Sequence, residues 1–507
     1  MVGVPGRSKA CSTCRRRRKG CDQQRPACGQ CIRAALPCGG YERQRIFVQM
    51  TPDDAAGGPL YRSDAPKVLP DALALSAFEE SHLAEFWQAY LPGADGDEVL
   101  AATGTQLLGV RHWIKAVQQL YVSDVSLKKA LLAMSLSTLG KATRQNWMIE
   151  EGLRQQIGAV SLMKKALKAS SLTQKESIMG TARLISLFVI LHGANKKDTL
   201  SHTRSWQGLS MGELAIITSR SPEAYTSGHA HHLFVEGRQQ LAFGAISLRR
   251  RTNLTSPEWM NIPWSLQPKT PRDYMTDIML HLPEILEYTT LYMACDDAVE
   301  KERLRLKNIE LSWKCDRFLQ DWARKHCPIK IDTDRAVEEA MPELRENLAL
   351  AYMMTHYWGA CLLIYGTLRT MLDPREPLPD RTELRQYCRY QTALIPAFYS
   401  PKAGVAGRHM VSFTVVSTIG ILRAIDVGVP SPEIEFIMGY IEKFGFVKAI
   451  SERTFPDPLL RKSFRELAKM EGLRQAYRGL SLPSEATSSV PYPMVAEATP
   501  GVLFASA

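Results

Sequence analysis

Six cysteines within 28 residues constrain this chain more than any other feature of its sequence. The spacing C-x2-C-x6-C occurs twice, at Cys11, Cys14 and Cys21 and again at Cys28, Cys31 and Cys38. Residues 7–47 contain too few apolar side chains to build a core, so something other than burial must hold them together. One zinc ion takes four tetrahedral ligands, and six thiolates serve two ions if two sulfurs bridge. The spacing therefore predicts a small module with short helices around two Zn²⁺ ions, with all six cysteines as ligands.

Three other structures would also use clustered cysteines: a disulfide knot, an iron–sulfur site, and a zinc ribbon with only a structural role. The first ten residues, MVGVPGRSKA, lack the apolar stretch of a secretory signal, which favours reduced thiols over a knot. An iron–sulfur cluster takes four thiolates and fits a doublet of three cysteines poorly. Haem attachment is excluded because Arg15 and Ile32, rather than histidines, follow the two C-x2-C pairs. What separates a purely structural ribbon from a binding module is the sequence between the ligands.

Positive charge is concentrated in the same part of the chain. The sequence has 63 Lys and Arg against 52 Asp and Glu, a formal net charge of +11, and residues 1–50 hold 11 of these cations and only 2 of the acids. Between Cys14 and Cys21 stand five consecutive cations: Arg15, Arg16, Arg17, Arg18 and Lys19. A free basic run is usually solvated or serves as a nuclear import signal. Zinc ligands at both ends are expected to force this run into about one and a half helical turns.

Guanidinium groups on such a short helix can grip guanine edges in the major groove or neutralise phosphates. Lys9 and further arginines of the module add cations for contacts to the DNA backbone. The pattern therefore predicts double-stranded DNA as the partner, with Lys9, Arg15, Arg16, Arg17, Arg18 and Lys19 as the contacting residues. An import role for the same run remains an alternative or additional function.

Arg7 to Tyr41, RSKACSTCRRRRKGCDQQRPACGQCIRAALPCGGY, closely resembles the binuclear zinc-cluster DNA-binding domain of fungal transcription factors. The resemblance implies that Cys11 and Cys28 bridge the two zinc ions. It also implies that Arg18, with Arg17 beside it, reads CGG-type triplets. Pro26 occupies the loop position where the family has a proline, whereas Gly20 stands where the family usually has Lys or Arg.

This resemblance implies a nuclear, sequence-specific regulator of genes transcribed by RNA polymerase II. Its expected partners are promoter DNA and the transcription machinery, and a metabolic or secondary-metabolite gene cluster is one candidate target. Family members that bind as dimers often carry a coiled coil after the cluster. Residues 42–80 contain several prolines and no heptad pattern, so the sequence does not support a homodimer.

The rest of the chain predicts an all-α fold. Closely spaced glycines and prolines indicate a flexible linker over residues 48–74. Apolar residues then recur at helical spacing over residues 75–480, including a stretch from Asp273 to Lys325 that Pro283 is expected to break or kink. Residues 481–507 have the composition of a disordered tail. No apolar stretch is long enough for a membrane span, so no membrane is expected as a partner.

The 75–480 region resembles the regulatory domain that accompanies such zinc clusters. The resemblance is carried by Phe78 to Trp87, by His231 to Phe234 with Arg238, and by Trp259 to Trp264. It implies a helical domain that regulates or recruits, without indicating what signal the domain receives.

Three further features of this region have both functional and ordinary interpretations. His229, His231 and His232 could form a second metal site or simply begin a helix, and Arg249–Arg251 could contact nucleic acid or simply end one. The five remaining cysteines lack C-x2-C pairing and are expected to be small buried side chains: Cys295, Cys315, Cys327, Cys361 and Cys388. No phosphate-binding, dinucleotide-binding, zinc-protease or serine-hydrolase motif is present, so we expect no enzyme.

Overall fold

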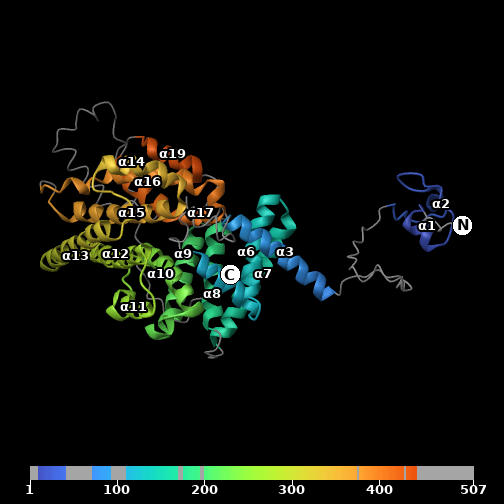
Figure 1. Cartoon of the computed structure of the whole chain (residues 1–507), viewed down its shortest axis with the longest axis horizontal. Coiled ribbons are helices and arrows are strands. Elements are labelled where there is room, and N and C mark those ends of the chain that lie inside the picture. Colours follow the sequence, from blue (N-terminus) through green and yellow to red (C-terminus); the bar gives the residue numbers. More distant parts are fainter. Residues whose placement is uncertain are drawn as a thin grey trace, which may run out of the picture. The chain divides into compact units, whose positions relative to one another are not determined.

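The chain divides into two compact units, Met1–Pro70 and Asp71–Ala507, and each is described by itself (Figure 1). The structure is a computed structural model, and it describes residues 9–41, 71–92, 110–168, 175–193, 199–373, 376–426 and 430–441. The predicted linker therefore lies almost wholly outside the described residues, and the predicted tail lies entirely outside them. Helix α3 begins at Asp71, inside the range predicted as linker.

Helices make up both units, and the described residues contain no strand. The all-α prediction is confirmed. The first unit has two short helices, α1 (Ser12–Arg16) and α2 (Gly29–Arg33). The first helices of the second unit are α3 (Asp71–Tyr90), α5 (Val110–Leu120), α6 (Val125–Thr143), α7 (Asn146–Lys168), α8 (Lys175–His192), α9 (Thr199–Thr218) and α10 (Gly228–Leu248).

The second unit continues with α11 (Pro257–Asn261), α12 (Pro271–Ala294), α13 (Ala298–Lys325), α14 (Asp334–Glu346), α15 (Leu348–Met371), α16 (Leu384–Phe398), α17 (Ala406–Met410), α18 (Ser412–Ile425) and α19 (Pro432–Ile441). Short 3₁₀ turns connect several of them: η4 (Pro222–Tyr225), η5 (Asn253–Thr255), η6 (Ile262–Trp264), η7 (Asp380–Thr382) and η8 (Pro401–Ala403). Many neighbours in sequence pack as pairs, among them α6 with α7 and α12 with α13.

Pro283 does not end a helix, contrary to one of the two outcomes expected from the sequence. It lies buried inside α12, which runs on to Ala294. The chain breaks instead before α13, where the Asp297 side chain accepts the backbone N–H of Glu300 at 2.7 Å and so caps the new helix. Burial of the middle of α12 outweighs the backbone hydrogen bond that proline removes.

Helix α15 is the buried central helix of the group formed by the later helices of the second unit. Nearly all of its side chains are buried, and it packs against α12, α13, α16 and α18 (Figure 1). Among the described helices it alone has the length and apolar composition to cross a membrane, and its most apolar stretch is wholly buried inside the protein. Its composition is therefore accounted for by packing in the core.

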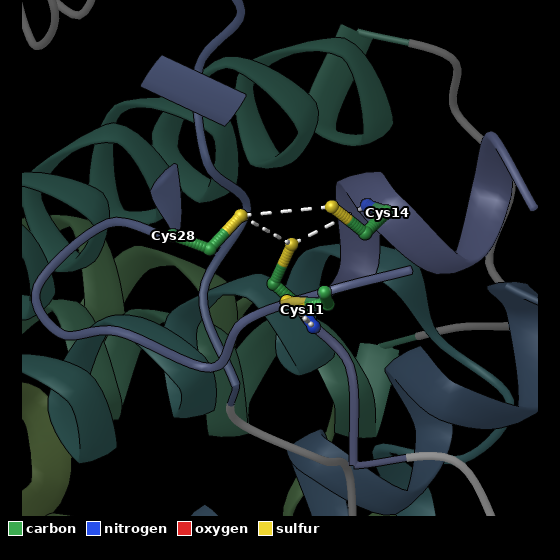
Figure 2. Close-up of side chains that lie close together, drawn as sticks. Cys11, Cys14 and Cys28 are labelled. Atoms are coloured by element: carbon green, nitrogen blue, oxygen red, sulfur yellow. Dashed lines mark hydrogen bonds between the residues drawn. The ribbon is translucent and has the colours of Figure 1, made fainter. Parts of the chain in front are cut away.

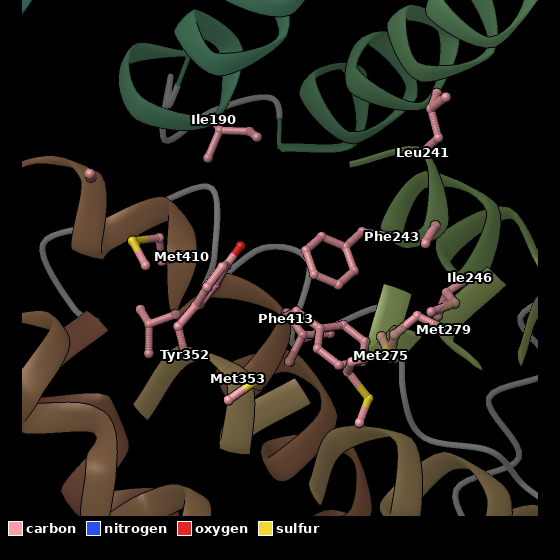
Figure 3. Close-up of a cluster of buried hydrophobic side chains, with 14 of the residues drawn as sticks. Ile190, Leu241, Phe243, Ile246, Met275, Met279, Tyr352, Met353, Met410 and Phe413 are labelled. Atoms are coloured by element: carbon pink, nitrogen blue, oxygen red, sulfur yellow. The ribbon is translucent and has the colours of Figure 1, made fainter. Parts of the chain in front are cut away.

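The core beside α15 combines aromatic rings with methionines from several helices (Figure 3). Phe243 of α10 stacks on Phe413 of α18 with ring centroids 4.7 Å apart. Met275 and Met279 of α12 and Tyr352 of α15 are buried in the same cluster. These contacts join helices that are far apart in the sequence into one hydrophobic core.

Candidate metal centre and nucleic-acid interface

The six cysteines of the first unit form two overlapping groups of four sulfurs. Cys11, Cys14, Cys21 and Cys28 make one group, and Cys11, Cys28, Cys31 and Cys38 make the other, with all sulfurs of a group within 4.8 Å of one another. Cys11 and Cys28 belong to both groups, and their Sγ atoms are 3.6 Å apart (Figure 2). A tetrahedron with Zn–S bonds of about 2.3 Å has sulfur–sulfur edges of about 3.8 Å. The spacing fits two adjacent four-sulfur sites with two shared corners.

The same backbone turn, repeated 17 residues later, builds both halves of the cluster. Cys11 and Cys28 precede α1 and α2, and each sulfur accepts the backbone N–H of the cysteine three residues on, at 3.3 Å. Each helix then ends in a left-handed residue, Arg18 (φ 52°) or Ala35 (φ 50°). In both halves the following N–H bonds back to the second cysteine's carbonyl, at 3.0 Å. This double turn is a Schellman ending, and it directs the chain toward the third cysteine.

Hydrogen bonds between the halves hold the two turns together. The Thr13 hydroxyl donates to the Pro37 carbonyl at 3.0 Å and accepts the Gly39 N–H at 2.9 Å. The Ser12 hydroxyl donates to the Gly39 carbonyl at 2.7 Å. A Cβ atom on Gly39 would stand 2.1 Å from the Ser12 oxygen, so any larger residue would displace the Ser12 hydroxyl from this contact.

The sulfurs differ in their electrostatic surroundings. Burial raises the pKa of Cys14, Cys28 and Cys31, which favours neutral thiols. Backbone N–H groups instead lower the pKa of Cys21 and of Cys38 to about 7, and they would stabilise thiolates at these two positions. A cluster of six sulfurs, with four of them buried, therefore needs cations to become fully ionised.

The donor set indicates which metal fits. Each four-membered group consists of sulfur ligands alone, which suits zinc and soft metal ions rather than magnesium or calcium. The cysteines are free of disulfides, with neighbouring sulfurs 3.6 Å or more apart rather than at the bonded distance of about 2.0 Å. Shared corners also distinguish the arrangement from an iron–sulfur site with four separate thiolates. Zinc is thus the best match to the residues present.

The basic run adopts a conformation that differs from the predicted one and a half helical turns. Helix α1 ends at Arg16, Arg17 is its C-cap, and Arg18 is left-handed. Only Arg15 and Arg16 of the five cations lie in the helix. The prediction was wrong because it treated the run as a continuation of the helix, whereas the Schellman turn must reverse the chain so that Cys21 can reach the cluster.

All five cations of this turn are exposed, as is Lys9. Within the part of the chain that the structure describes, no acidic side chain forms an ion pair with any of these five cations. Asp22 is the only acid within residues 9–41, and its carboxylate accepts the backbone N–H of Gly29 at 3.0 Å. The turn therefore presents a compact positive surface on a rigid base of cysteines.

Two residues near the cluster were not identified from the sequence. Asp22 bonds to the first residue of α2, and Tyr41 donates its hydroxyl to the Gln24 carbonyl at 2.7 Å. The Arg25 guanidinium lies over the Tyr41 ring, 5.4 Å from its centroid. The 17-residue repeat of the cysteines was the available signal, because comparing the two halves position by position would have drawn attention to both residues.

The histidines at the start of α10 do not converge on one point. His232 stacks on His112 of α5 with centroids 4.8 Å apart and an angle of 15° between the rings, so the in-plane lone pairs run nearly parallel. His231 donates to the Tyr225 carbonyl at 2.8 Å, and His229 contacts the Gln119 amide at 2.6 Å. Burial, with the neighbouring histidines, lowers the pKa of His232 to about 4. This arrangement favours the ordinary interpretation over a second metal site.

The other two features also have structural roles. Arg249 is the left-handed cap of α10, and Arg251 lies 3.6 Å from Glu284 and 3.1 Å from Glu287. Cys315, Cys361 and Cys388 are buried as expected, whereas Cys295 and Cys327 are half-buried. Burial raises the pKa of Cys315 to about 12 and of Cys327 to about 11, which makes both thiols weak nucleophiles.

Comparison with known families finds one match in this chain. Residues 9–45 match the family described as the fungal Zn(2)-Cys(6) binuclear cluster domain. Comparisons with curated proteins and with solved structures find no match. The matched range contains all six clustered cysteines and the whole basic run.

Proposed function

The first unit is a fungal Zn(2)-Cys(6) binuclear cluster domain that binds two zinc ions, and from this premise we propose that the chain is a transcription regulator whose Arg18 turn reads CGG-type triplets in promoter DNA. Proteins with this domain are DNA-binding regulators, so the match at residues 9–45 supports a role as a DNA-binding regulator. The choice of bases, the contacting residues and the genes controlled are the proposal.

In this proposal, one zinc ion is held by Cys11, Cys14, Cys21 and Cys28 and the other by Cys11, Cys28, Cys31 and Cys38. The two overlapping sulfur groups support the assignment. When bound, the ions supply the positive charge that keeps all six thiolates ionised, and they replace the missing hydrophobic core. The protein backbone around the ions holds the exposed run Arg15–Lys19 in a fixed orientation.

The exposed run Arg15–Lys19, placed between two cysteines of the cluster, is the observation that carries the proposal. A residue with a side chain in the left-handed region is destabilised by about 1 kcal/mol relative to glycine. Arg18 nevertheless occupies the tip of the exposed turn at φ 52°. Here the retained side chain is a guanidinium, which can bind guanine O6 and N7 together.

The neighbouring cations have a different role. Arg15, Arg16, Arg17, Lys19 and Lys9 surround the tip and are placed to neutralise phosphates, which fixes the register of the module on the duplex. Their contribution depends on salt and little on sequence. The same exposed run could serve in nuclear import when DNA is absent.

Arg18→Gly tests base reading without straining the turn. Glycine suits the left-handed backbone and removes the whole arginine side chain, which is exposed and is not a zinc ligand, so zinc content should stay unchanged. We expect binding to a CGG-containing duplex to weaken by about 1–3 kcal/mol, with a smaller change on a scrambled duplex. Fluorescence anisotropy of the full chain on both duplexes measures the difference.

Ala35→Gly is the matched control, because Ala35 has the equivalent backbone position in the second half. It should leave DNA affinity unchanged. Equal losses on both duplexes for Arg18→Gly would reduce Arg18 to a phosphate contact. Binding by the unaltered chain that ignores both sequence and salt would favour a purely structural zinc module, the second candidate.

Gly20→Lys is expected to strengthen DNA binding. A Cβ atom at Gly20 would meet no atom within 4 Å, so the fold does not require glycine there. The added cation follows the exposed run and should neutralise one further phosphate, which steepens the plot of log K against log salt by about 0.9. A salt titration of binding to the same duplex measures this slope, and an unchanged slope would place residue 20 away from the DNA backbone.

For the second unit we propose a regulatory role in the nucleus, with contacts to the transcription machinery and a metabolic or secondary-metabolite gene cluster as target. The support is its association with the DNA-binding module in one chain and its resemblance to the regulatory domain of such factors. Genome-wide mapping of bound sites would test this. The targets give the pathway, and the spacing of the half-sites shows whether two copies bind together.

A further inference from the structure

The two half-exposed sulfurs of the metal centre have nearly equivalent surroundings. Cys21 accepts backbone N–H groups from Cys11 and Gln23. The backbone N–H groups of Cys28 and Gly40, which lie 17 positions later, are the corresponding neighbours of Cys38. Both sulfurs are half-buried, whereas the other four of the cluster are buried. The backbone alone would therefore make the two metal positions alike.

Tyr41 breaks this equivalence. Its hydroxyl oxygen lies 3.9 Å from the Cys21 sulfur, and its ring packs against the cysteine cluster. The hydroxyl also donates to the Gln24 carbonyl at 2.7 Å, which anchors the loop that follows Cys21. A single phenol thus contacts the Cys21 sulfur and restrains the chain next to it.

The equivalent contact to Cys38 would have to come from Gln24, which is 17 residues before Tyr41. The Gln24 side chain lies beside Gly29 instead of beside Cys38. Its amide oxygen is 3.4 Å from the position that a Cβ atom on Gly29 would occupy. The described residues offer no hydroxyl to Cys38. Among the residues that the structure describes, its neighbours include the backbone N–H groups of Cys28 and Gly40 and the other sulfurs.

We propose that Tyr41 is a positioning residue that makes the two zinc sites unequal: the ion held through Cys21 exchanges slowly, and the ion held through Cys38 exchanges first. The inference rests on the zinc assignment above but not on DNA reading. Groups that orient metal ligands from outside the coordination shell commonly change metal binding by about 10–100-fold. Covering a ligand also denies a competing chelator or thiol reagent access to it.

The test follows release of zinc from the full chain to an excess of a chromogenic chelator. We expect two phases of equal amplitude, one zinc ion each. Tyr41→Ala should accelerate the slow phase by about 10–100-fold and leave the fast phase nearly unchanged. Tyr41→Phe keeps the covering ring but loses the hydroxyl bond to Gln24, so it should accelerate the slow phase less.

Alkylation with iodoacetamide, read by peptide mass spectrometry, assigns the phases to sulfurs. Cys38 should be modified before Cys21 in the unaltered chain, and in Tyr41→Ala the rate at Cys21 should approach that at Cys38. Gln24→Ala is the control at the equivalent position and should change neither rate, because only the backbone carbonyl of Gln24 is used.

Release of both ions in one phase would overturn the inference, as would an equal acceleration of both phases by Tyr41→Ala and Tyr41→Phe, which would indicate a general loss of structure. Modification of Cys21 before Cys38 would also overturn it. A chain that binds no zinc would contradict the proposed function itself, so the two failures are distinguishable.

Discussion

Replacement of Cys11 by alanine is expected to release both zinc ions and unfold the first unit. Cys11 belongs to both four-sulfur groups, so its loss leaves each site with three sulfurs. Structural zinc contributes on the order of 10 kcal/mol or more to the folding of small modules. Within residues 9–41, which the structure describes, the buried cluster consists of four cysteines, and they cannot replace that contribution. DNA binding should be lost together with the metal.

Zinc content of the purified full chain, measured by elemental analysis, checks this result. Cys14→Ala is the control, because Cys14 belongs to only one group. This variant should weaken the binding of one zinc ion and retain about one zinc per chain, since the second group keeps all four sulfurs. If Cys11→Ala retained two equivalents of zinc, Cys11 would not bridge the ions.

Glu213→Gln is expected to destabilise the second unit by about 3–5 kcal/mol, because it leaves a buried arginine without its counter-charge. Arg183 of α8 donates through Nε to the Glu213 carboxylate of α9 at 3.0 Å. Both side chains are only 3% exposed. Arg183 also donates to the Leu233 carbonyl of α10 at 3.4 Å, so the pair joins three helices.

Urea unfolding followed by the circular dichroism of the helices measures this effect. Glu339→Gln is the matched control: Glu339 pairs with Arg335 at 2.9 Å on one exposed helix face, where an ion pair contributes at most about 0.5 kcal/mol. The double variant Arg183→Met with Glu213→Leu should recover most of the lost stability, since apolar replacements remove both charges. A loss below 1 kcal/mol for Glu213→Gln would show that water reaches Arg183.

The cysteine spacing predicted the metal centre because its information is local. Each C-x2-C pair lies on one turn of helix, and the third cysteine returns after a short loop, so the ligand set can be read from the chain. The path between the ligands could not be read in the same way. The Schellman turns at Arg18 and Ala35 follow from the need to bring Cys21 and Cys38 back to the cluster, and neither position is a glycine that would have signalled the turn.

The helical unit shows the same division. Periodic apolar residues predicted its helices, because one helix face is enough to generate the pattern. Helix α12 continues through Pro283 because its middle is buried. The apolar periodicity of this segment does not show how deeply the helix is buried. The ion pair of Arg183 and Glu213 joins residues 30 positions apart. Nothing in the sequence around either residue distinguishes it from a charged residue exposed to solvent.

By itself, the sequence determined the metal-binding chemistry, the concentration of positive charge beside it and the all-helical character of the rest. These properties depend on residue type and short-range spacing. Only the tertiary structure decided that Arg18 adopts a left-handed backbone and that the Tyr41 hydroxyl lies beside Cys21 rather than beside Cys38. The physical reason is that these features depend on contacts between segments of the chain. The contacts form only when the two cysteine-containing halves of the first unit have packed against each other.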